Sequence, residues 1–326
     1  MDGHYRRIQE TENIMRLGLE TFSYHLAFRA GTINILTFIE RCVSLGLDGV
    51  QLNTGHMDAF LHEDSGRVRK VRELAAGNNL FVEVDARGTD PGHLANRLRL
   101  CRDLGADTLR TYASCGGDLA EELARAPAHL RSMIPMCQEF GIRIALENHE
   151  YETSQEIVEI VQQVDSEWVG THVDTGNSMM VWEEPVDAVR AMAPLAVSTH
   201  FKDHIVIMED GQPLVLATTL GRGNIDCREV LRILAADSSL ERLVIEDCYG
   251  YSAPFRRPEA EGAGGRLGEG AFRLVEGPLD PTWALLHPRE AAPEEMKKFI
   301  TWQEASVIRS VDFVKGLMAE SAKTGQ

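Results

Sequence analysis

Residues 142–175, IRIALENHEYETSQEIVEIVQQVDSEWVGTHVDT, contain the pattern from which the fold can be predicted. The runs IRIALENH (142–149) and VGTHVDT (169–175) are short and mostly apolar, which is typical of buried strands. Between them, TSQEIVEIVQQV (153–164) repeats apolar residues at steps of three and four, which is typical of a helix with one buried face. We therefore predict a strand, a helix and a second strand.

The same unit recurs along the chain. Six more strand-like runs precede or follow segments with helical periodicity: LGLETFS (17–23), GVQLN (49–53), LFVEVDA (80–86), TLRTYA (108–113), AVSTHFKD (196–203) and RLVIEDC (242–248). Alternating strands and helices of this kind predict a parallel sheet covered by helices. Eight units within about 310 residues predict an α/β protein whose sheet closes into a (β/α)8 barrel, the TIM-barrel fold.

An open, doubly wound sheet is the alternative architecture. Such a sheet would favour a glycine-rich GxGxxG turn after the first strand, where a dinucleotide binds. The first strand is followed instead by TFSYHLAF (21–28). This absence favours the closed barrel.

Two regions lie outside the repeat. Residues 1–14 are polar and are predicted to form an N-terminal arm, and residues 15–326 are predicted to form one barrel domain. Residues 251–293 are dense in Gly, Pro and charge, and a connection this long is usually functional or disordered. After the eighth strand it would lie on the catalytic face, so we predict a lid or a subunit contact. Its predicted apolar anchors are Phe255, Phe272 and Trp283.

Composition and charge exclude several classes of partner. The 326 residues are 44% hydrophobic and 25% charged, as in an ordinary globular protein. With 33 basic and 50 acidic residues the net charge is −17, which opposes binding to nucleic acid or to an anionic membrane. The sequence contains no apolar run long enough for a membrane span and no apolar signal-peptide core, so we predict a cytoplasmic location.

The six cysteines are scattered, with no CxxC pair, and are predicted to be reduced and mostly buried thiols. Cys115 and Cys248 lie near predicted strand ends, where a nucleophile is the less favoured interpretation.

Four of the later strand-like runs end in residues that could bind a metal: Glu147, Asp174, His200 and Glu246. A barrel brings the carboxyl ends of its strands to one rim. A single such carboxylate would more often cap a helix or form a salt bridge, but four strand ends in succession weaken that interpretation. Three carboxylates and one imidazole suit one hard divalent cation, with Mn²⁺ favoured and Mg²⁺ or Co²⁺ as alternatives.

The motifs LENHE, THVDTGN, THFKDH, LGRGNID and VIEDCYG, in this order, resemble the sugar isomerase and epimerase family built on the xylose-isomerase-like TIM barrel. That family includes ketose 3-epimerases and hydroxypyruvate isomerase, and the similarity covers roughly residues 15–250. The resemblance implies that Glu147, Asp174, His200 and Glu246 are metal ligands. It also implies that Glu147 and Glu246 are the catalytic acid–base pair.

The implied reaction removes a proton beside a carbonyl of a keto sugar or sugar acid and passes through an enediolate. The predicted substrate-binding residues are His149, Asn177, Lys202 and Arg222. His172 lies two residues before Asp174 and is predicted to lie deeper, in the core. We expect a small-molecule substrate and a homo-oligomer, or a hetero-oligomer with a small subunit.

Three departures from the family pattern leave the reaction open. Gln51 stands where relatives commonly have Glu, Asn177 stands where many have His, and the insertion 251–293 is unusual. A lyase on the same core is therefore the alternative: decarboxylation of a 3-oxo sugar acid, dehydration, or cleavage of a 3-oxo C-glycoside.

Two other classes are less favoured. Endonucleases with the same barrel use several zinc ions on a histidine-rich site, but His25, His56 and His93 do not make a matching set and the net charge opposes DNA. A non-catalytic barrel subunit is the remaining alternative; it would purify without a stoichiometric metal ion.

Overall fold

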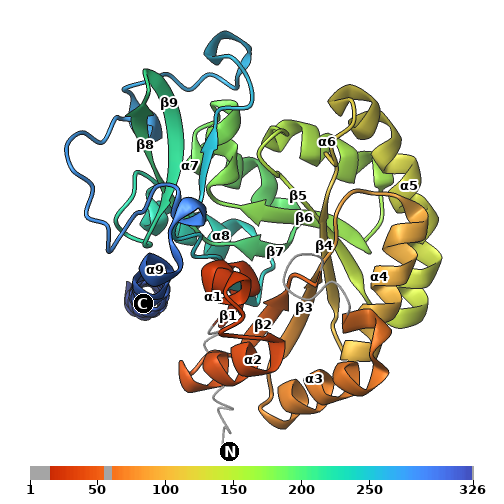
Figure 1. The fold of residues 1–326 in the computed structure, drawn as a ribbon. Coiled ribbons are helices and arrows are strands. Elements are labelled where there is room, and N and C mark those ends of the chain that lie inside the picture. Colours follow the sequence, from red (N-terminus) through yellow and green to blue (C-terminus); the bar gives the residue numbers. More distant parts are fainter. Residues whose placement is uncertain (1–14, 55–60, 325–326) are drawn as a thin grey trace, which may run out of the picture.

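The computed structural model describes residues 15–54 and 61–324, and it contains eight parallel strands in a nearly closed barrel (Figure 1). In pairing order the strands are β10 (Arg242–Ile245), β1 (Arg16–Glu20), β2 (Gly49–Leu52), β3 (Phe81–Asp85), β4 (Thr108–Tyr112), β5 (Arg143–Glu147), β6 (Val169–Asp174) and β7 (Ala196–His200). All eight predicted strands are confirmed. The predicted arm, residues 1–14, lies outside the described residues.

The barrel closes between β7 and β10 through irregular backbone contacts. The N–H of Phe201 donates to the carbonyl of Val244 at 2.8 Å, and the N–H of Glu246 donates to the carbonyl of Phe201 at 3.1 Å. Because this seam holds the end of β7 beside the end of β10, it brings together the residues that follow both strands.

Helices cover the outside of the barrel. They are the short α1 (His25–Arg29), then α2 (Ile35–Ser44), α3 (Ser65–Gly77), α4 (Pro91–Leu104), α5 (Leu119–Phe140), α6 (Ser154–Val164), α7 (Pro185–Met192), α8 (Cys227–Asp237) and α9 (Pro293–Thr324). Short 3-10 turns are η1 (Thr21–Tyr24), η2 (Leu61–Glu63), η3 (Asn177–Val181), η4 (Ala193–Leu195), η5 (Glu259–Glu261), η6 (Gly270–Phe272) and η7 (Pro288–Glu290). No helix within the described ranges combines the length and apolarity needed to cross a membrane.

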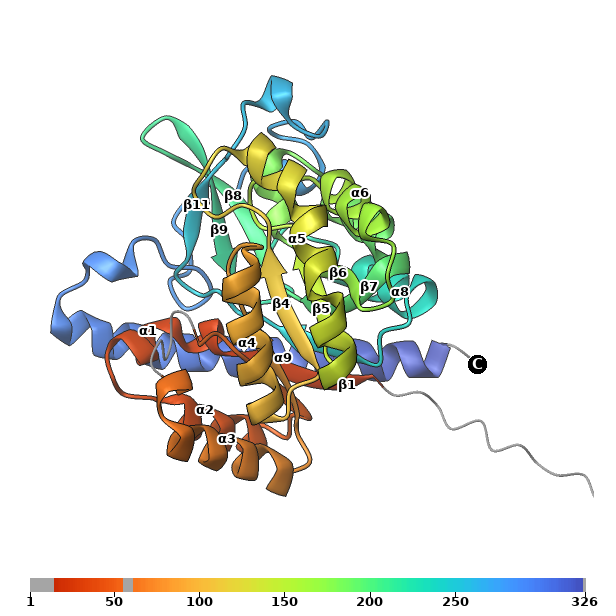
Figure 2. The same ribbon diagram turned by 90° about the vertical axis from the view of Figure 1, so that its right-hand side faces the viewer.

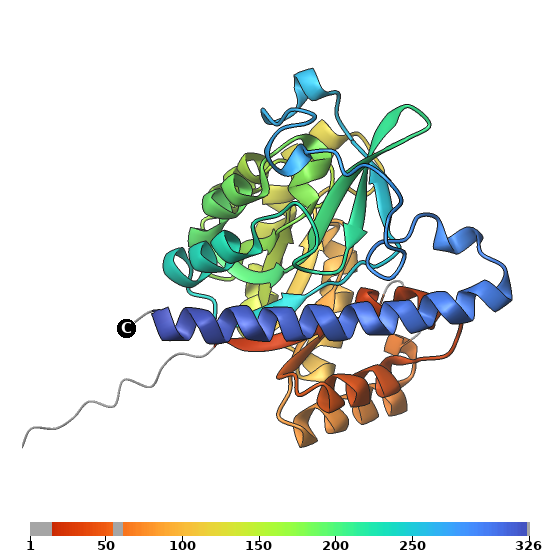
Figure 3. The same cartoon turned by 90° about the vertical axis from the view of Figure 1, so that its left-hand side faces the viewer.

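The helix boundaries follow local chemistry. Thr153 and Glu156 form a capping box that begins α6, which satisfies N–H groups that have no partner inside the helix. Gly141 ends α5 at φ 68°, a left-handed conformation that glycine adopts without steric cost. The long helix α9 runs along the barrel beside β1, where it contacts α1 and α8 and so takes the place of the eighth covering helix (Figure 3).

A second, three-stranded antiparallel sheet was not predicted. It consists of β8 (Asp203–Glu209), β9 (Gln212–Thr218) and β11 (Ser252–Pro254), in the order β11-β9-β8. The predicted run 196–203 is therefore divided: its strand ends at His200, and the chain continues into a hairpin. The turn Asp210–Gly211 has positive φ at both residues, 48° and 78°, which is the conformation that two-residue hairpin turns require. Figure 2 shows the small sheet on the side toward which β4 points.

The insertion 251–293 begins as part of this small sheet, because β11 pairs with β9. Two of its predicted anchors are packed: Phe255 stacks on Trp182 with ring centroids 3.7 Å apart, and Phe272 is completely buried. Trp283 is half-buried. The role of this segment as a lid or subunit contact stays a prediction.

Asp203, at the start of β8, organises the loop that leads from the hairpin to α8. One carboxylate oxygen accepts from the N–H groups of Gly221 and Gly223 at 3.0 and 2.7 Å, and the other accepts from those of His204 and Ile225 at 2.9 and 3.2 Å. Asp203 is 1% exposed, so water cannot take the place of its carboxylate as the acceptor for these four N–H groups.

We predict that Asp203→Asn lowers the free energy of unfolding by about 1–3 kcal/mol, because either orientation of the amide sets its NH₂ group against two N–H donors. Urea unfolding measures the change. The control is Asp210→Asn in the exposed hairpin turn, where asparagine tolerates a positive φ. Equal stability of the two variants would contradict the prediction.

Candidate active site

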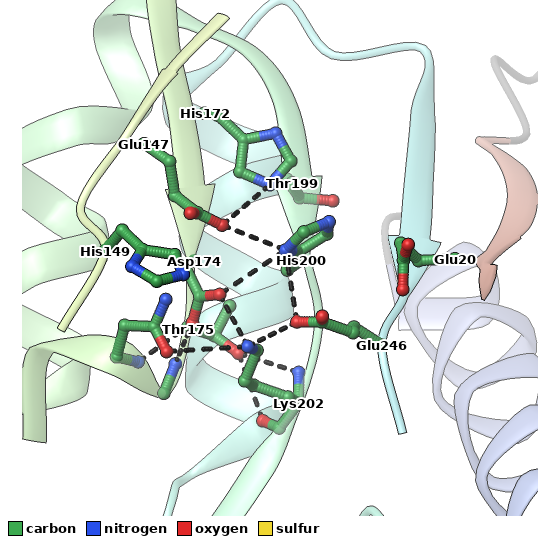
Figure 4. Close-up of polar contacts among 12 residues, drawn as sticks. Glu20, Glu147, His149, His172, Asp174, Thr175, Thr199, His200, Lys202 and Glu246 are labelled. Carbon is green, nitrogen blue, oxygen red and sulfur yellow. Dashed lines mark hydrogen bonds and ion pairs between the residues drawn. The ribbon is translucent and has the colours of Figure 1, made fainter. Parts of the chain in front are cut away.

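The four predicted ligands meet at the carboxyl ends of their strands (Figure 4). Nδ1 of His200 lies 2.9 Å from Oε1 of Glu147, 3.5 Å from Oδ2 of Asp174 and 3.2 Å from Oε2 of Glu246. Glu147, Asp174 and His200 are completely buried, and Glu246 is 8% exposed. The structure therefore gathers these side chains around one imidazole nitrogen.

These four facing atoms are the reason to expect a cation. Each of them is buried and makes no hydrogen bond of good geometry, although Oδ2 of Asp174 and Oε2 of Glu246 face the single ammonium group of Lys202. Buried carboxylate oxygens that face one another are costly unless a cation or a full set of donors meets them. Two overlapping groups have ligand atoms close enough for a metal ion, and both contain His200: one adds Asp174 and Glu246, the other adds Glu147 and His172. The residues present thus fit a divalent cation with oxygen and nitrogen ligands.

His172 is buried in the barrel, as predicted, and it also belongs to this site. Its Nε2 lies 3.5 Å from Oε1 of Glu147, and its ring meets that of His200 edge-on, with centroids 4.2 Å apart. Burial lowers the pKa of His172 well below its usual value, and the charge of His200 adds to this effect. A neutral imidazole is the form that binds metals.

The carboxylate of Asp174 is oriented by the backbone that follows it. Its Oδ1 accepts from the N–H groups of Gly176 and Asn177 at 2.9 and 2.8 Å, which turns Oδ2 toward His200. Asn148 adds a pair of hydrogen bonds to the backbone of Asp174, at 2.9 and 3.0 Å.

Lys202 supplies part of the positive charge. Its Nζ lies 2.8 Å from Oδ2 of Asp174 and also contacts Oε2 of Glu246 and, at 3.5 Å, Oδ1 of Asn177. Burial alone would lower the pKa of Lys202, but Asp174 and the neighbouring acids outweigh it and hold the pKa well above its usual range. The ammonium group therefore stays charged inside the protein.

Arg110 is a second buried cation, and it was not predicted. It comes from β4, contacts Oε2 of Glu147 and lies 3.6 Å from Oδ2 of Asp85. The signal available in the sequence was a charged residue inside the apolar run TLRTYA (108–113). By holding one oxygen of Glu147, Arg110 leaves the other oxygen facing His200.

The tautomer of His200 is set by Gln51, the residue that departs from the family pattern. The amide nitrogen of Gln51 donates to Oε2 of Glu83 at 2.7 Å, and Oε1 of Glu83 forms an ion pair with Arg242 at 2.7 Å. The amide oxygen of Gln51 therefore faces His200 and contacts its Nε2. When the imidazole is neutral, its proton stays on Nε2 and the lone pair of Nδ1 points at the three carboxylates.

Two glutamates beside the site differ in their tendency to ionise. Burial raises the pKa of Glu20 well above its usual value, and the charges of Asp85 and Glu246 add to the rise. Burial would also raise the pKa of Glu246, but His200 and Lys202 outweigh it and hold that pKa well below its usual value. Opposite pKa shifts of this kind in two neighbouring carboxyl groups are what separates an acid from a base.

A cavity of about 230 Å³ opens above these groups. Its lining includes four of the predicted residues: His149, Asn177, Lys202 and Glu246. His149 stacks on Tyr112 with ring centroids 4.0 Å apart, and burial lowers its pKa, so its imidazole is neutral. Glu147 is not part of the lining, because it lies one layer deeper.

Arg222, the remaining predicted substrate-binding residue, lies outside this cavity. It is exposed, its guanidinium lies 4.1 Å from the ring centroid of Trp283, and it does not line the cavity. The backbone of the loop LGRGNID is folded around Asp203 instead.

Five of the six cysteines are buried and Cys115 is exposed. Cys248 lines the cavity, but burial and the charge of Glu246 raise its pKa well above the usual value. A protonated thiol is a poor nucleophile, which disfavours that alternative.

Comparison with known proteins identifies a matching family model and two similar proteins. A family model described as xylose isomerase-like TIM barrel matches residues 39–261. The uncharacterized protein YihM of Escherichia coli (strain K12) is 23% identical over 262 residues, covering 78% of this chain and 80% of that protein. The 3-oxo-isoapionate decarboxylase of Pectobacterium atrosepticum is 23% identical over 203 residues, covering 60% of this chain and 72% of that protein.

Solved structures share the fold at low identity. The structure of L-ribulose 3-epimerase has a TM-score of 0.58 at 16% identity and covers 95% of this chain and 96% of its own. The IolI protein with a bound zinc atom has a TM-score of 0.60 at 15% identity and covers 91% of this chain and 98% of its own. At such identities the likeness establishes the barrel alone.

We predict that Gln51→Met weakens Mn²⁺ binding by about 10- to 100-fold, because the variant keeps a similar volume but loses the acceptor that orients His200. Isothermal titration calorimetry on metal-free protein measures the affinity. Urea unfolding of the same metal-free variant serves as the control for a general loss of stability. An unchanged affinity in a folded variant would show that Gln51 does not orient the imidazole.

Proposed function

We propose, on the premise that the chain belongs to the xylose isomerase-like TIM-barrel family, that it is a divalent-metal-dependent isomerase or epimerase of a keto sugar or sugar acid. The observation that carries the proposal is the set of four buried, facing ligand atoms of Glu147, Asp174, His200 and Glu246. A divalent cation held there, with Mn²⁺ favoured, would act as a Lewis acid that makes the C–H beside a carbonyl acidic.

Glu246 is the carboxylate with access to the cavity. Its Oε2 contacts His200 and Lys202, which leaves Oε1 to take a proton from a sugar carbon. The same two cations hold its pKa low, so Glu246 is ionised at neutral pH. It thus has both the position and the protonation state of a general base.

Glu147 remains the second member of the proposed acid–base pair, with a different environment. It lies beneath the cavity, with Arg110 on one oxygen and His200 and His172 on the other. Because Glu147 is buried beneath the cavity, its main proposed role is to bind the cation. Inversion of that centre would require Glu147 to be in its acid form, so that it donates a proton to the face opposite Glu246. Return of the abstracted proton by Glu246 to the neighbouring carbon would isomerise the sugar.

The neutral side chains of the cavity orient the substrate in this proposal. His149, fixed by its stack on Tyr112, and Asn177, fixed through its backbone by Asp174, present hydrogen-bonding groups for sugar hydroxyls. Lys202 lies between the carboxylates and the cavity, where it can donate to a carbonyl or hydroxyl oxygen.

A lyase that decarboxylates a 3-oxo sugar acid is the second candidate. The observation that favours it is the similarity to the 3-oxo-isoapionate decarboxylase. Loss of CO₂ from such an acid leaves an enediolate-like carbanion, which the same cation would stabilise and to which a protonated carboxyl group of the site would donate a proton.

Incubation of the Mn²⁺-loaded protein with ketoses and 3-oxo sugar acids in D₂O tests the proposal. We expect deuterium at the carbon beside the carbonyl of the recovered sugar, measured by NMR and mass spectrometry. Release of CO₂ without exchange into a recovered sugar would favour the lyase. If a metal-loaded protein gives neither deuterium exchange nor CO₂ release, both the isomerase and the lyase proposals are contradicted. The non-catalytic subunit is then the remaining alternative.

We predict that Glu246→Gln lowers the rate of deuterium exchange by about 10²- to 10⁴-fold at saturating Mn²⁺, because the amide takes no proton. Glu147→Gln should mainly weaken Mn²⁺ binding. The matched control is Glu167→Gln, an exposed position before β6 at the opposite end of the barrel. An unchanged rate of deuterium exchange in the Glu246→Gln variant would show that Glu246 is not the base.

A further inference from the structure

The cavity carries two arginines whose charge no carboxylate offsets. Four cationic side chains line it: Arg87, Arg110, Lys202 and Arg289. Arg110 and Lys202 are buried and paired with acids of the site. Arg87 donates to the Tyr112 hydroxyl at 2.7 Å, and within residues 15–54 and 61–324 neither Arg87 nor Arg289 forms an ion pair.

These two arginines lie at the mouth, and the proposed chemistry lies at the floor. Arg87 and Arg289 are exposed, whereas Lys202 is 5% and Glu246 is 8% exposed. The two arginines also come from different parts of the barrel: Arg87 follows β3, and Arg289 belongs to η7 in the insertion 251–293. A ligand that reaches from Glu246 to the mouth thus meets positive charge at its far end.

The position of Arg289 is built into the insertion. Pro288 packs against Gly250, where an added Cβ would come within 2.7 Å of the proline ring, and Gly250 has φ 83°. Arg29 of α1 donates to the carbonyl of Arg289 at 3.3 Å. Both contacts tie η7 to the rim of the barrel, so the guanidinium is carried to the cavity by a packed segment.

An unpaired guanidinium in a chain of net charge −17 indicates an anionic ligand. The planar fork of arginine matches a carboxylate or a phosphate with two parallel hydrogen bonds. Beside this cavity, the loop at residues 114–117 has the glycine-rich composition of a phosphate cradle. Its N–H groups at Cys115 and Gly117 already donate to the carboxylate of Glu122, at 2.8 and 3.2 Å. Because Glu122 already fills this loop, the loop offers no cradle for a phosphate, and we take a carboxylate as the anionic group of the ligand.

We propose that Arg87 and Arg289 clamp the carboxylate of a sugar acid, so that the enzyme acts on keto sugar acids of the uronate type in preference to neutral ketoses. The inference rests on the proposed function and narrows its substrate class. The carboxylate held at the mouth is distant from the carbon that reacts at Glu246, and it is stabilised as an anion. It therefore stays on the substrate and is not lost as CO₂.

Matched pairs of sugars test the clamp. The probes are D-fructose and D-tagatose, the acids D-fructuronate and D-tagaturonate, which carry a carboxylate at C6, and the corresponding 6-phosphates. Titration calorimetry with the Mn²⁺-loaded protein measures affinity, and deuterium exchange in D₂O measures turnover. We expect at least one acid to bind tenfold or more tightly than its neutral partner and its 6-phosphate.

Single variants assign that preference to the two arginines. Arg289→Gln and Arg87→Gln should each weaken binding of the acid by tenfold or more, and the ratio of acid to neutral-ketose affinity should fall by tenfold or more in each variant. The control is Arg266→Gln, which removes the same charge from an exposed position of the insertion that does not line the cavity. This control should leave both affinities unchanged.

The outcomes separate the clamp from the proposed function. Deuterium exchange into a neutral ketose without any preference for its acid would overturn the clamp and leave the proposed function standing. A preference for the 6-phosphate, or an acid affinity that neither variant lowers, would also overturn the clamp. No binding and no exchange with any of the six sugars would count against both.

Discussion

Three buried carboxylates share one small space beside a single imidazole, and most of the structure around them supplies the positive charge that this requires. Two like charges 4 Å apart repel by about 4 kcal/mol at an effective dielectric constant of 20. Glu147, Asp174 and Glu246 all lie within 3.5 Å of the same nitrogen of His200. Lys202 meets two of these carboxylates directly, and the facing atoms without hydrogen bonds mark where a divalent cation would complete the balance.

Inside the barrel, below the rim, further ion pairs and hydrogen bonds support these charged groups. Beneath the site, Arg242 holds Glu83, Glu83 accepts from Gln51, and Gln51 contacts His200. Ser198 adds a hydrogen bond to Glu83 at 2.5 Å. These side chains form a connected polar network through the middle of the barrel. Each contact fixes whether the next group acts as a hydrogen-bond donor or acceptor. Such buried networks rigidify a site when all their members are satisfied.

The walls of the cavity come from segments far apart in the sequence. Glu150, in a left-handed conformation at φ 58° after β5, accepts from Arg256 and from the hydroxyl of Tyr251, both in the insertion 251–293. Strained backbone of this kind persists when surrounding contacts hold it, and these contacts join the loop to the insertion. The same insertion carries Arg289 to the mouth, so its packing and the charge of the cavity are linked.

The sequence alone predicted the eight strands and the converging ligands, because both depend on local patterns: apolar runs form strands, and parallel strands bring their ends to one rim. It did not predict the hairpin β8–β9, although Asp210–Gly211 is a hairpin turn. Only the tertiary structure decided that Arg110 pairs with Glu147, that Gln51 orients His200, and that Arg222 lies outside the cavity on Trp283. These pairings depend on which side chains meet across the barrel and on the path of long loops, and neither is written in the spacing of residues along one strand.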